Sequence, residues 1–219
     1  MDVIKAIMDR HSVRNYLDKR IEQDKIDALN AKIDEVNAEG NLHLQFLEDA
    51  GKTFSRLLNR AMGLGSAPSV IACAGPDDGT LSEHIGYYGE QVVLLAQDLG
   101  LNTCWAGTFS PKNTPAELAP GEKLVIVIAI GYGTTQGTQH KSKKPEQVAP
   151  GYDGSPDWFR SGVDMALLAP TAINQQRFAI ALNSDEKVTF TDKGGPFSKV
   201  DLGIVKYHFE AGAAYAGTH

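Results

Sequence analysis

The pattern of apolar and polar residues divides the chain into helical and extended stretches. Apolar residues recur every three or four positions from Ile26 to Val36, which predicts an amphipathic helix over residues 21–37 that ends at Gly40. Residues 83–99 are apolar on most sides near their end, so we expect a long, buried helix there. Three further helices are predicted before residue 10, from Ser155-Pro156 to about Leu168, and over residues 199–213.

Extended stretches lie between these helices. Residues 41–48 alternate polar and apolar side chains, as a half-buried strand does, whereas 70–74 and 123–130 are continuously apolar, as interior strands are. A brief strand is expected at 102–107, and a hairpin at 177–182 and 187–191. Because helices and strands do not alternate regularly, we predict an α+β fold in which helices flank a mixed, mostly antiparallel sheet.

Composition and charge limit the possible functions. The 219 residues are 42% hydrophobic and include no run of 18 apolar residues, so no membrane-spanning helix is expected. The start of the chain lacks the features of a signal peptide, which favours a cytoplasmic protein with reduced cysteines. A net charge of -6 argues against nucleic acid and anionic membrane as partners. The histidines show no metal-ligand spacing, so no metal is expected.

The segment Arg10-His11-Ser12-Val13-Arg14-Asn15-Tyr16 concentrates cationic and hydrogen-bonding groups against this negative background. An arginine fork matches an anionic oxyacid such as phosphate, and the hydroxyl of Ser12 can donate a hydrogen bond to the same group. A solvated basic turn beside a helix end is the alternative interpretation.

Three other segments carry candidate binding groups, each with a structural alternative. Residues 104–108 end in a glycine that lets a ligand approach the backbone, or they form a strand end with a buried Trp105. Lys141-Ser142-Lys143-Lys144 is a second cationic cluster, or a solvated run of charge. Residues 169–176 offer amide donors and acceptors suited to a heteroaromatic ring, or they form a turn. No dinucleotide fingerprint, P-loop or nucleophile elbow is present.

Together these segments resemble the signatures of the FMN-dependent nitroreductase family. Arg10–Tyr16 is similar to the family's N-terminal motif, and Gly100-Leu101-Asn102-Thr103-Cys104-Trp105 to the segment that follows its buried helix. Lys141-Ser142-Lys143 resembles its late phosphate clamp, and Pro170-Thr171-Ala172-Ile173-Asn174-Gln175-Gln176 its segment with a conserved asparagine. The resemblance, closest to the divergent branch of Thermotoga-type nitroreductases, implies a nitroreductase-like fold and an FMN cofactor.

The resemblance also implies roles for individual residues. Arg14 would lie near the flavin N1/O2 edge, and the backbone of Gly107 near flavin N5, so no side chain is expected to act as a nucleophile. The expected cofactor-binding residues are Arg10, His11, Ser12, Arg14, Trp105, Gly107, Lys141, Lys143, Pro170, Thr171, Ala172 and Asn174. The implied reaction passes hydride from NADH or NADPH through flavin N5 to a nitroaromatic or quinone-like acceptor, with residues 51–65 and 134–139 near the acceptor.

The position of Asn174 departs from the family's usual order. In ordinary members the corresponding segment follows the N-terminal motif within a few dozen residues and reaches over from the partner of a homodimer. Here it lies near the C-terminal end. This order suggests that 1–219 is one domain with pseudo-halves at 1–150 and 155–219, so the protein is a monomeric pseudo-dimer or a homodimer.

Two other functions fit the same motifs. One is a flavin-binding or storage protein without turnover. The other is an enzyme of the same fold with different flavin chemistry, such as flavin breakdown or dehalogenation, because a fold does not fix a function.

Overall fold

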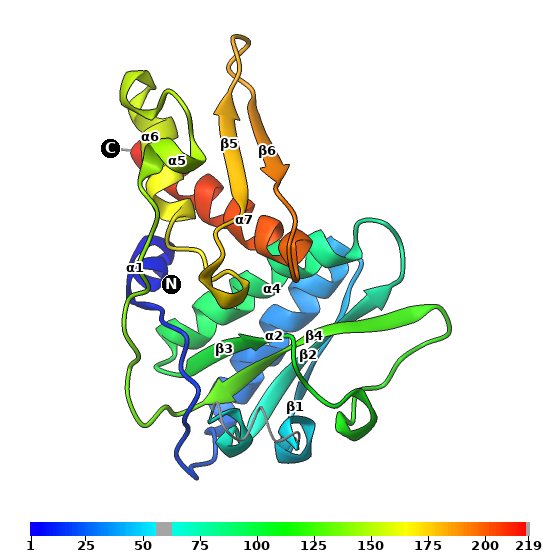
Figure 1. Ribbon diagram of the computed structural model, residues 1–219. Coiled ribbons are helices and arrows are strands. Elements are labelled where there is room, and N and C mark those ends of the chain that lie inside the picture. The colour runs from blue at the N-terminus through cyan, green and yellow to red at the C-terminus, as the bar shows by residue number, and fades with distance from the viewer. Residues whose placement is uncertain (56–62, 218–219) are drawn as a thin grey trace.

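The fold is that of a four-stranded sheet, flanking helices and a separate β-hairpin, seen in a computed structural model that describes residues 1–55 and 63–217 (Figure 1). The helices are α1 (Val3–Asp9), α2 (Gln23–Gly40), α4 (Leu81–Asp98), α5 (Pro145–Val148), α6 (Asp157–Ala166) and α7 (Ser198–Gly217). The strands are β1 (His43–Leu47), β2 (Ser69–Pro76), β3 (Asn102–Ala106), β4 (Glu122–Gly131), β5 (Phe178–Leu182) and β6 (Val188–Asp192). Short 3-10 turns are η1 (Gly51–Phe54), η2 (Leu64–Ser66), η3 (Pro111–Asn113), η4 (Tyr152–Gly154) and η5 (Ala172–Asn174).

The sheet has the strand order β1-β2-β4-β3, and every pair in it is antiparallel. Strand β4, one of the two inner strands, is buried on both faces from Ile126 onward, because Ile128 packs into the core with α2 and α4 while its neighbours Val127 and Ala129 face a second apolar cluster. The prediction of a doubly buried strand from its β-branched run is therefore confirmed. The α+β class and the mostly antiparallel sheet are confirmed as well.

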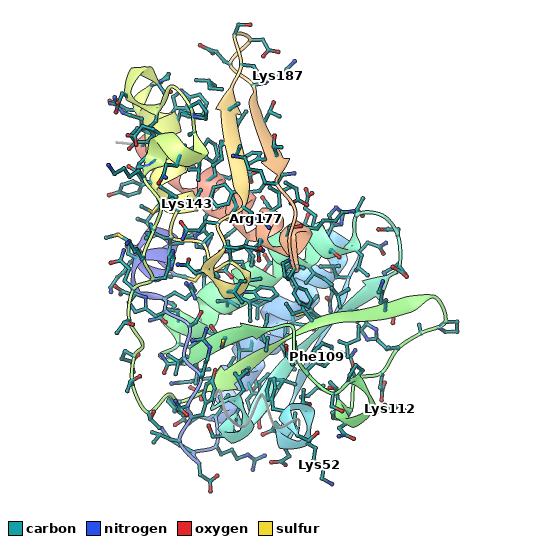
Figure 2. All side chains as sticks on the ribbon, in the orientation of Figure 1. Lys52, Phe109, Lys112, Lys143, Arg177 and Lys187 are labelled. Atoms are coloured by element: carbon teal, nitrogen blue, oxygen red, sulfur yellow. The ribbon has the colours of Figure 1, made fainter. Side chains whose placement is uncertain are left out.

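The C-terminal part of the chain builds a second layer beyond α4. Helix α7 packs against both α4 and α6, and the β5–β6 hairpin lies on α7 through contacts such as Phe190 with Phe209. The hairpin points away from the sheet, so Lys187 at its tip lies at the opposite end of the molecule from Lys52 and Lys112 (Figure 2). Among the described residues, no helix is long and apolar enough to span a membrane.

Several predicted helix boundaries differ from those observed by a few residues. Gly40, expected just past the last turn as the residue that ends α2, is the last residue of the helix, and Asn41 takes the left-handed conformation (φ 50°). A Cβ on Gly40 would lie 2.6 Å from the ring of Tyr88, so packing explains this glycine. Helix α6 begins at Asp157 with Pro156 as its N-cap, because the Ser155 hydroxyl donates to the Gly151 carbonyl instead of capping the helix.

Helices α4 and α7 cross with their backbones in direct contact. A Cβ built on Gly86 of α4 would lie 2.0 Å from the carbonyl oxygen of Val200, and one on Gly203 of α7 would lie 2.0 Å from that of Glu83. Real side-chain carbons do not approach a backbone oxygen so closely. The two glycines therefore permit the crossing that joins the two layers.

Gly203→Ala should lower the free energy of unfolding by about 1–3 kcal/mol or more, because the added methyl group must push two helix backbones apart. Gly217→Ala, in the same helix, is the matched control, since no described atom lies within 4 Å of its Cβ position. Urea unfolding of the two variants checks this, and equal stability would contradict a close-packed crossing.

Candidate functional site

The Arg10–Tyr16 segment is extended and lies along the free edge of the sheet. The Val13 amide donates to the Thr103 carbonyl at 3.0 Å, and Ser12 forms a parallel bridge with Thr103 of β3. Side chains on an extended segment alternate, so Val13 is buried in the protein while its neighbours Ser12 and Arg14 face the other way. Both of these neighbours line cavities that adjoin β3.

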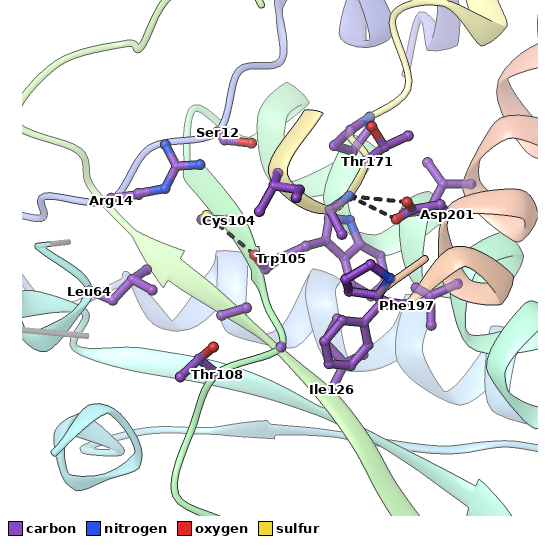
Figure 3. A pocket seen from close by; sticks show the side chains of 18 residues that line it. Ser12, Arg14, Leu64, Cys104, Trp105, Thr108, Ile126, Thr171, Phe197 and Asp201 are labelled. Atoms are coloured by element: carbon purple, nitrogen blue, oxygen red, sulfur yellow. Dashed lines mark hydrogen bonds between the residues drawn. The ribbon is translucent and has the colours of Figure 1, made fainter. Parts of the chain in front are cut away.

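An apolar cavity of about 280 Å³ opens between the end of β3 and the start of α7 (Figure 3). Figure 3 shows Leu64 and Thr108 on the side opposite Thr171 and Asp201, with Arg14 and Phe197 at the two ends. The lining residues are Ser12, Arg14, Leu64, Cys104, Trp105, Ala106, Gly107, Thr108, Ile126, Pro170, Thr171, Ala172, Ile173, Pro196, Phe197, Val200, Asp201 and Ile204. Of the loop expected near an acceptor, residues 56–62 lie outside the described residues, and Leu64 reaches this cavity.

Phe197 closes the apolar cavity against Gly107. A Cβ on Gly107 would lie 2.1 Å from the Phe197 ring, so the ring rests directly on the glycine backbone. Phe197 itself has φ 54°, which is strained for an aromatic residue, and its exposed fraction is 38%. The fold thus maintains a strained backbone at Phe197, and this conformation places the ring over Gly107.

Asp201 is a buried carboxyl group in the wall of the apolar cavity. Its two oxygens accept hydrogen bonds from the Ala172 amide at 3.0 and 3.1 Å, and Oδ2 accepts another from Gln175 Nε2 at 2.7 Å. Burial raises the pKa of Asp201 to about 6, although these hydrogen bonds act in the opposite direction. Asp201 thus joins the backbone of Ala172 and the side chain of Gln175 to α7, at the cost of burying its carboxyl group.

A second, polar cavity of about 440 Å³ adjoins the first. It is lined by Arg10, His11, Ser12, Arg14, Thr138, Gln139, His140, Pro170, Thr171, Ile173 and Asn174. Five of these residues also line the apolar cavity: Ser12, Arg14, Pro170, Thr171 and Ile173. A ligand with a flat apolar part and an anionic part could therefore occupy both cavities at once.

Arg10 supplies a buried cation to the polar cavity. Its side chain is 3% exposed, and its Nε lies 3.6 Å from Glu90 Oε1. That Nε is buried and has no hydrogen-bond partner among the described residues. Burial lowers the pKa of Arg10, and the nearby Glu90 opposes this shift. A buried donor without a partner is costly, so a negatively charged acceptor in this cavity fits the residues present.

The segment around Asn174 bends sharply between the cavities. Ile173, Asn174 and Gln176 all have positive φ values, and Ile173 is 89% exposed. A β-branched residue is strained there, which is typical of segments held for function. Asn174 Nδ2 donates to the Lys141 carbonyl at 2.9 Å, and its Oδ1 accepts from Gln176 Nε2. Asn174 thus lies in the polar cavity and joins the long connection to the turn, rather than facing the apolar cavity.

The structure brings together most of the predicted site residues, but not the two lysines. Lys143 Nζ donates to the Gln176 carbonyl at 2.6 Å, and Lys141 is exposed. Neither lysine is among the residues that line the two cavities. Their role in holding a phosphate stays a prediction.

Several residues at the site were not anticipated from the sequence. Phe197 and Asp201 lie in the apolar cavity, and His140 in the polar one. The only sequence signal for Phe197 is its position after Gly194-Gly195-Pro196, which is typical of a turn. Among the described residues, no group of three or more His, Cys, Asp and Glu side chains is placed to hold a metal ion.

Comparison with known proteins identifies the family. The model of the family described as "Putative TM nitroreductase" matches residues 2–213. The chain belongs to this family. No curated protein matches the sequence significantly.

Solved structures of nitroreductases share the fold. A "putative nitroreductase" of Thermotoga maritima MSB8 is 23% identical, with a TM-score of 0.72 over 100% of this chain and 87% of that one. A nitroreductase of Desulfovibrio desulfuricans in complex with FMN is 18% identical, with a TM-score of 0.52 over 66% of this chain and 94% of its own. An NADH dehydrogenase/NAD(P)H nitroreductase of Bacteroides thetaiotaomicron is 19% identical, with a TM-score of 0.54 over 68% of this chain and 96% of its own. The D. desulfuricans and B. thetaiotaomicron proteins are also described as putative.

The raised pKa of Asp201 predicts a pH-dependent contribution to stability. The folded chain retains a proton on this carboxyl that the unfolded chain releases, so wild-type stability falls relative to Asp201→Asn as pH rises from about 4 through about 6. The difference between the two unfolding free energies should change by roughly 1–3 kcal/mol. Urea unfolding at pH 4 and pH 7 measures it. Asp34→Asn, at an exposed position of α2, is the control. The prediction is wrong if the free energies of unfolding of the wild type and Asp201→Asn differ by the same amount at pH 4 and pH 7.

Proposed function

We propose that this protein is an FMN-dependent oxidoreductase that passes hydride from NADH or NADPH to nitroaromatic or quinone-like acceptors. The observation that carries the proposal is the pair of adjoining cavities, one apolar and one lined by a buried arginine whose Nε has no hydrogen-bond partner in the described part of the chain. Bound FMN would supply the redox chemistry by accepting and donating hydride at N5. The protein's part is to bind, orient and shield it.

The polar cavity would hold the phosphate of FMN. Arg10 and Ser12 both line it, and a charged hydrogen bond from a buried guanidinium is among the strongest available to a phosphate. His11 lies in the same wall and can contact the phosphate or the neighbouring ribityl chain. Lys141 and Lys143 would join this group only if their side chains turned toward the cavity, since Lys143 is engaged by Gln176.

The apolar cavity would hold the flavin ring. Trp105, Gly107 and Ala172 line this cavity alone, whereas Pro170 and Thr171 lie where it meets the polar cavity. Arg14 also lines both cavities, which suits a cation placed beside the N1/O2 edge, where reduction builds negative charge. The Gly107 backbone amide would face N5 once the Phe197 ring had moved off the glycine.

Relatives support the cofactor and the reductant. The D. desulfuricans structure contains FMN, and the B. thetaiotaomicron protein carries NAD(P)H in its name. Both share the fold with this chain, and the proposal extends their ligands to it.

We further propose that the chain is a single-chain pseudo-dimer. Among the described helices and strands, a helix, a pair of antiparallel strands and a second helix follow one another twice, as α2-β1-β2-α4 and as α6-β5-β6-α7. The two closing helices, α4 and α7, pack on each other. The D. desulfuricans and B. thetaiotaomicron chains are matched over nearly their whole length, yet they leave about a third of this chain uncovered. This extra third is expected of a chain that carries part of a partner subunit.

Absorbance of the purified protein with FMN tests the proposed function. The protein should retain a yellow flavin band near ~450 nm, and anaerobic NADH or NADPH should bleach it. A protein that stays colourless and takes up no FMN would contradict the proposal. A yellow protein that neither nucleotide bleaches would instead be a flavin-binding protein without this activity.

A further inference from the structure

A polar cluster whose charged groups are buried lies next to both cavities. It consists of Arg10 from the N-terminal segment, Glu90 from α4, Trp105 from β3 and His208 from α7. The side chains of Glu90 and His208 are 0% exposed, and that of Arg10 is 3% exposed. Charged groups are rarely buried to this degree unless they are paired with an opposite charge. The net charge of the cluster therefore decides which of its groups lacks such a partner.

Glu90 is the centre of the cluster. Its Oε2 accepts a hydrogen bond from Trp105 Nε1 at 2.8 Å, and its Oε1 lies 3.0 Å from His208 Nε2 and 3.6 Å from Arg10 Nε. Trp105 lines the apolar cavity and Arg10 the polar one. One carboxyl group on α4 therefore holds a wall residue of each cavity.

The hydrogen bonds of His208 determine how many protons the cluster contains. His208 Nδ1 lies 3.2 Å from the Met165 carbonyl oxygen, which can only accept, so Nδ1 carries a proton. The contact of Nε2 with Glu90 then requires one more proton between them, because two lone pairs would repel each other. Whichever atom holds that proton, the His208–Glu90 pair is neutral overall.

This neutrality leaves the charge of Arg10 uncompensated. Without His208, Glu90 would be an anion 3.6 Å from the Arg10 Nε and would neutralise it. With His208, the cluster has a net charge of +1 beside a polar cavity, and the Arg10 Nε has no hydrogen-bond partner among the described residues. A buried net charge is unfavourable until an anion occupies the cavity.

We propose that His208 is a positioning residue for the anionic end of the cofactor site. It shares a proton with Glu90 and thereby keeps the positive charge of Arg10 available to the phosphate of FMN. Glu90, thus neutralised, still holds the indole of Trp105 in the wall of the apolar cavity. This role rests on the proposed function, and it predicts that His208 controls the preference for FMN over riboflavin, which lacks the phosphate.

Three variants separate this role from simple packing between α4 and α7. His208→Gln removes the shared proton and leaves the Glu90 anion to neutralise Arg10, so the cluster has no net charge. Glu90→Gln keeps the net charge at +1, since its amide can donate to a neutral His208 and its oxygen can accept from Trp105. The double variant again has a net charge of +1, so it should regain what His208→Gln loses. If the substitutions only disturbed packing, the defect of Glu90→Gln would instead add to that of His208→Gln.

Dissociation constants for FMN and riboflavin, measured by quenching of flavin fluorescence, give the readout. His208→Gln should reduce the preference for FMN over riboflavin by roughly tenfold or more, the effect expected for losing one net charge in a buried site. Glu90→Gln should stay within about threefold of the wild type, and the double variant should recover most of the loss. Arg10→Ala defines complete loss of the preference.

Each other outcome contradicts the proposal. It is wrong if His208→Gln keeps the wild-type preference, or if the double variant is no better than His208→Gln. Failure of the wild type to bind FMN would overturn the proposed function and this role with it, whereas FMN binding with unchanged preferences overturns this role alone. Should His208→Gln not fold, nitrogen-15 NMR of wild-type histidines is decisive, because a His208 Nδ1 without a proton would contradict the argument.

Discussion

The close crossing of α4 and α7 is the constraint on which the rest of the site depends. The helix backbones touch at Gly86 and Gly203, where no side chain could fit. About one turn further along each helix, this contact brings Glu90 against His208 in a region without solvent. The same crossing places Asp201, at the start of α7, in the wall of the apolar cavity. A C-terminal helix thus completes a site that begins at residue 10.

The site also depends on the free edge of the sheet. Strand β3 ends the sheet, so its outer edge is available to pair with the extended segment around Ser12. This pairing directs Arg14 toward the cavities. The turn at Ile173, from the C-terminal part of the chain, lines the same two cavities. The buried charge of Arg10 is a cost in folding free energy that a bound anionic cofactor would offset in part. The strain at Ile173 and Phe197 and the burial of Asp201 are further costs.

Local periodicity predicted most of the fold, because most elements show in their spacing of apolar residues which faces they bury. The β4 run, the α2 stripe and the β5–β6 hairpin were all recognisable from spacing alone. The Arg10 and Ser12 pair could also be identified, since their chemistry lies within three residues. By contrast, Glu90 and His208 are 118 residues apart, and each lies in a helix that carries several other polar residues. Nothing local specifies that they meet, which is why the charge balance at Arg10 emerged only from the three-dimensional structure.

A crystal structure with FMN bound tests the central claim most directly. We expect the phosphate in the polar cavity beside Arg10 and the flavin ring in the apolar cavity between Trp105 and the Pro170–Asn174 turn, with every contact made by one chain. A flavin bound elsewhere, or one that touches Asn174 of a second chain, would contradict it.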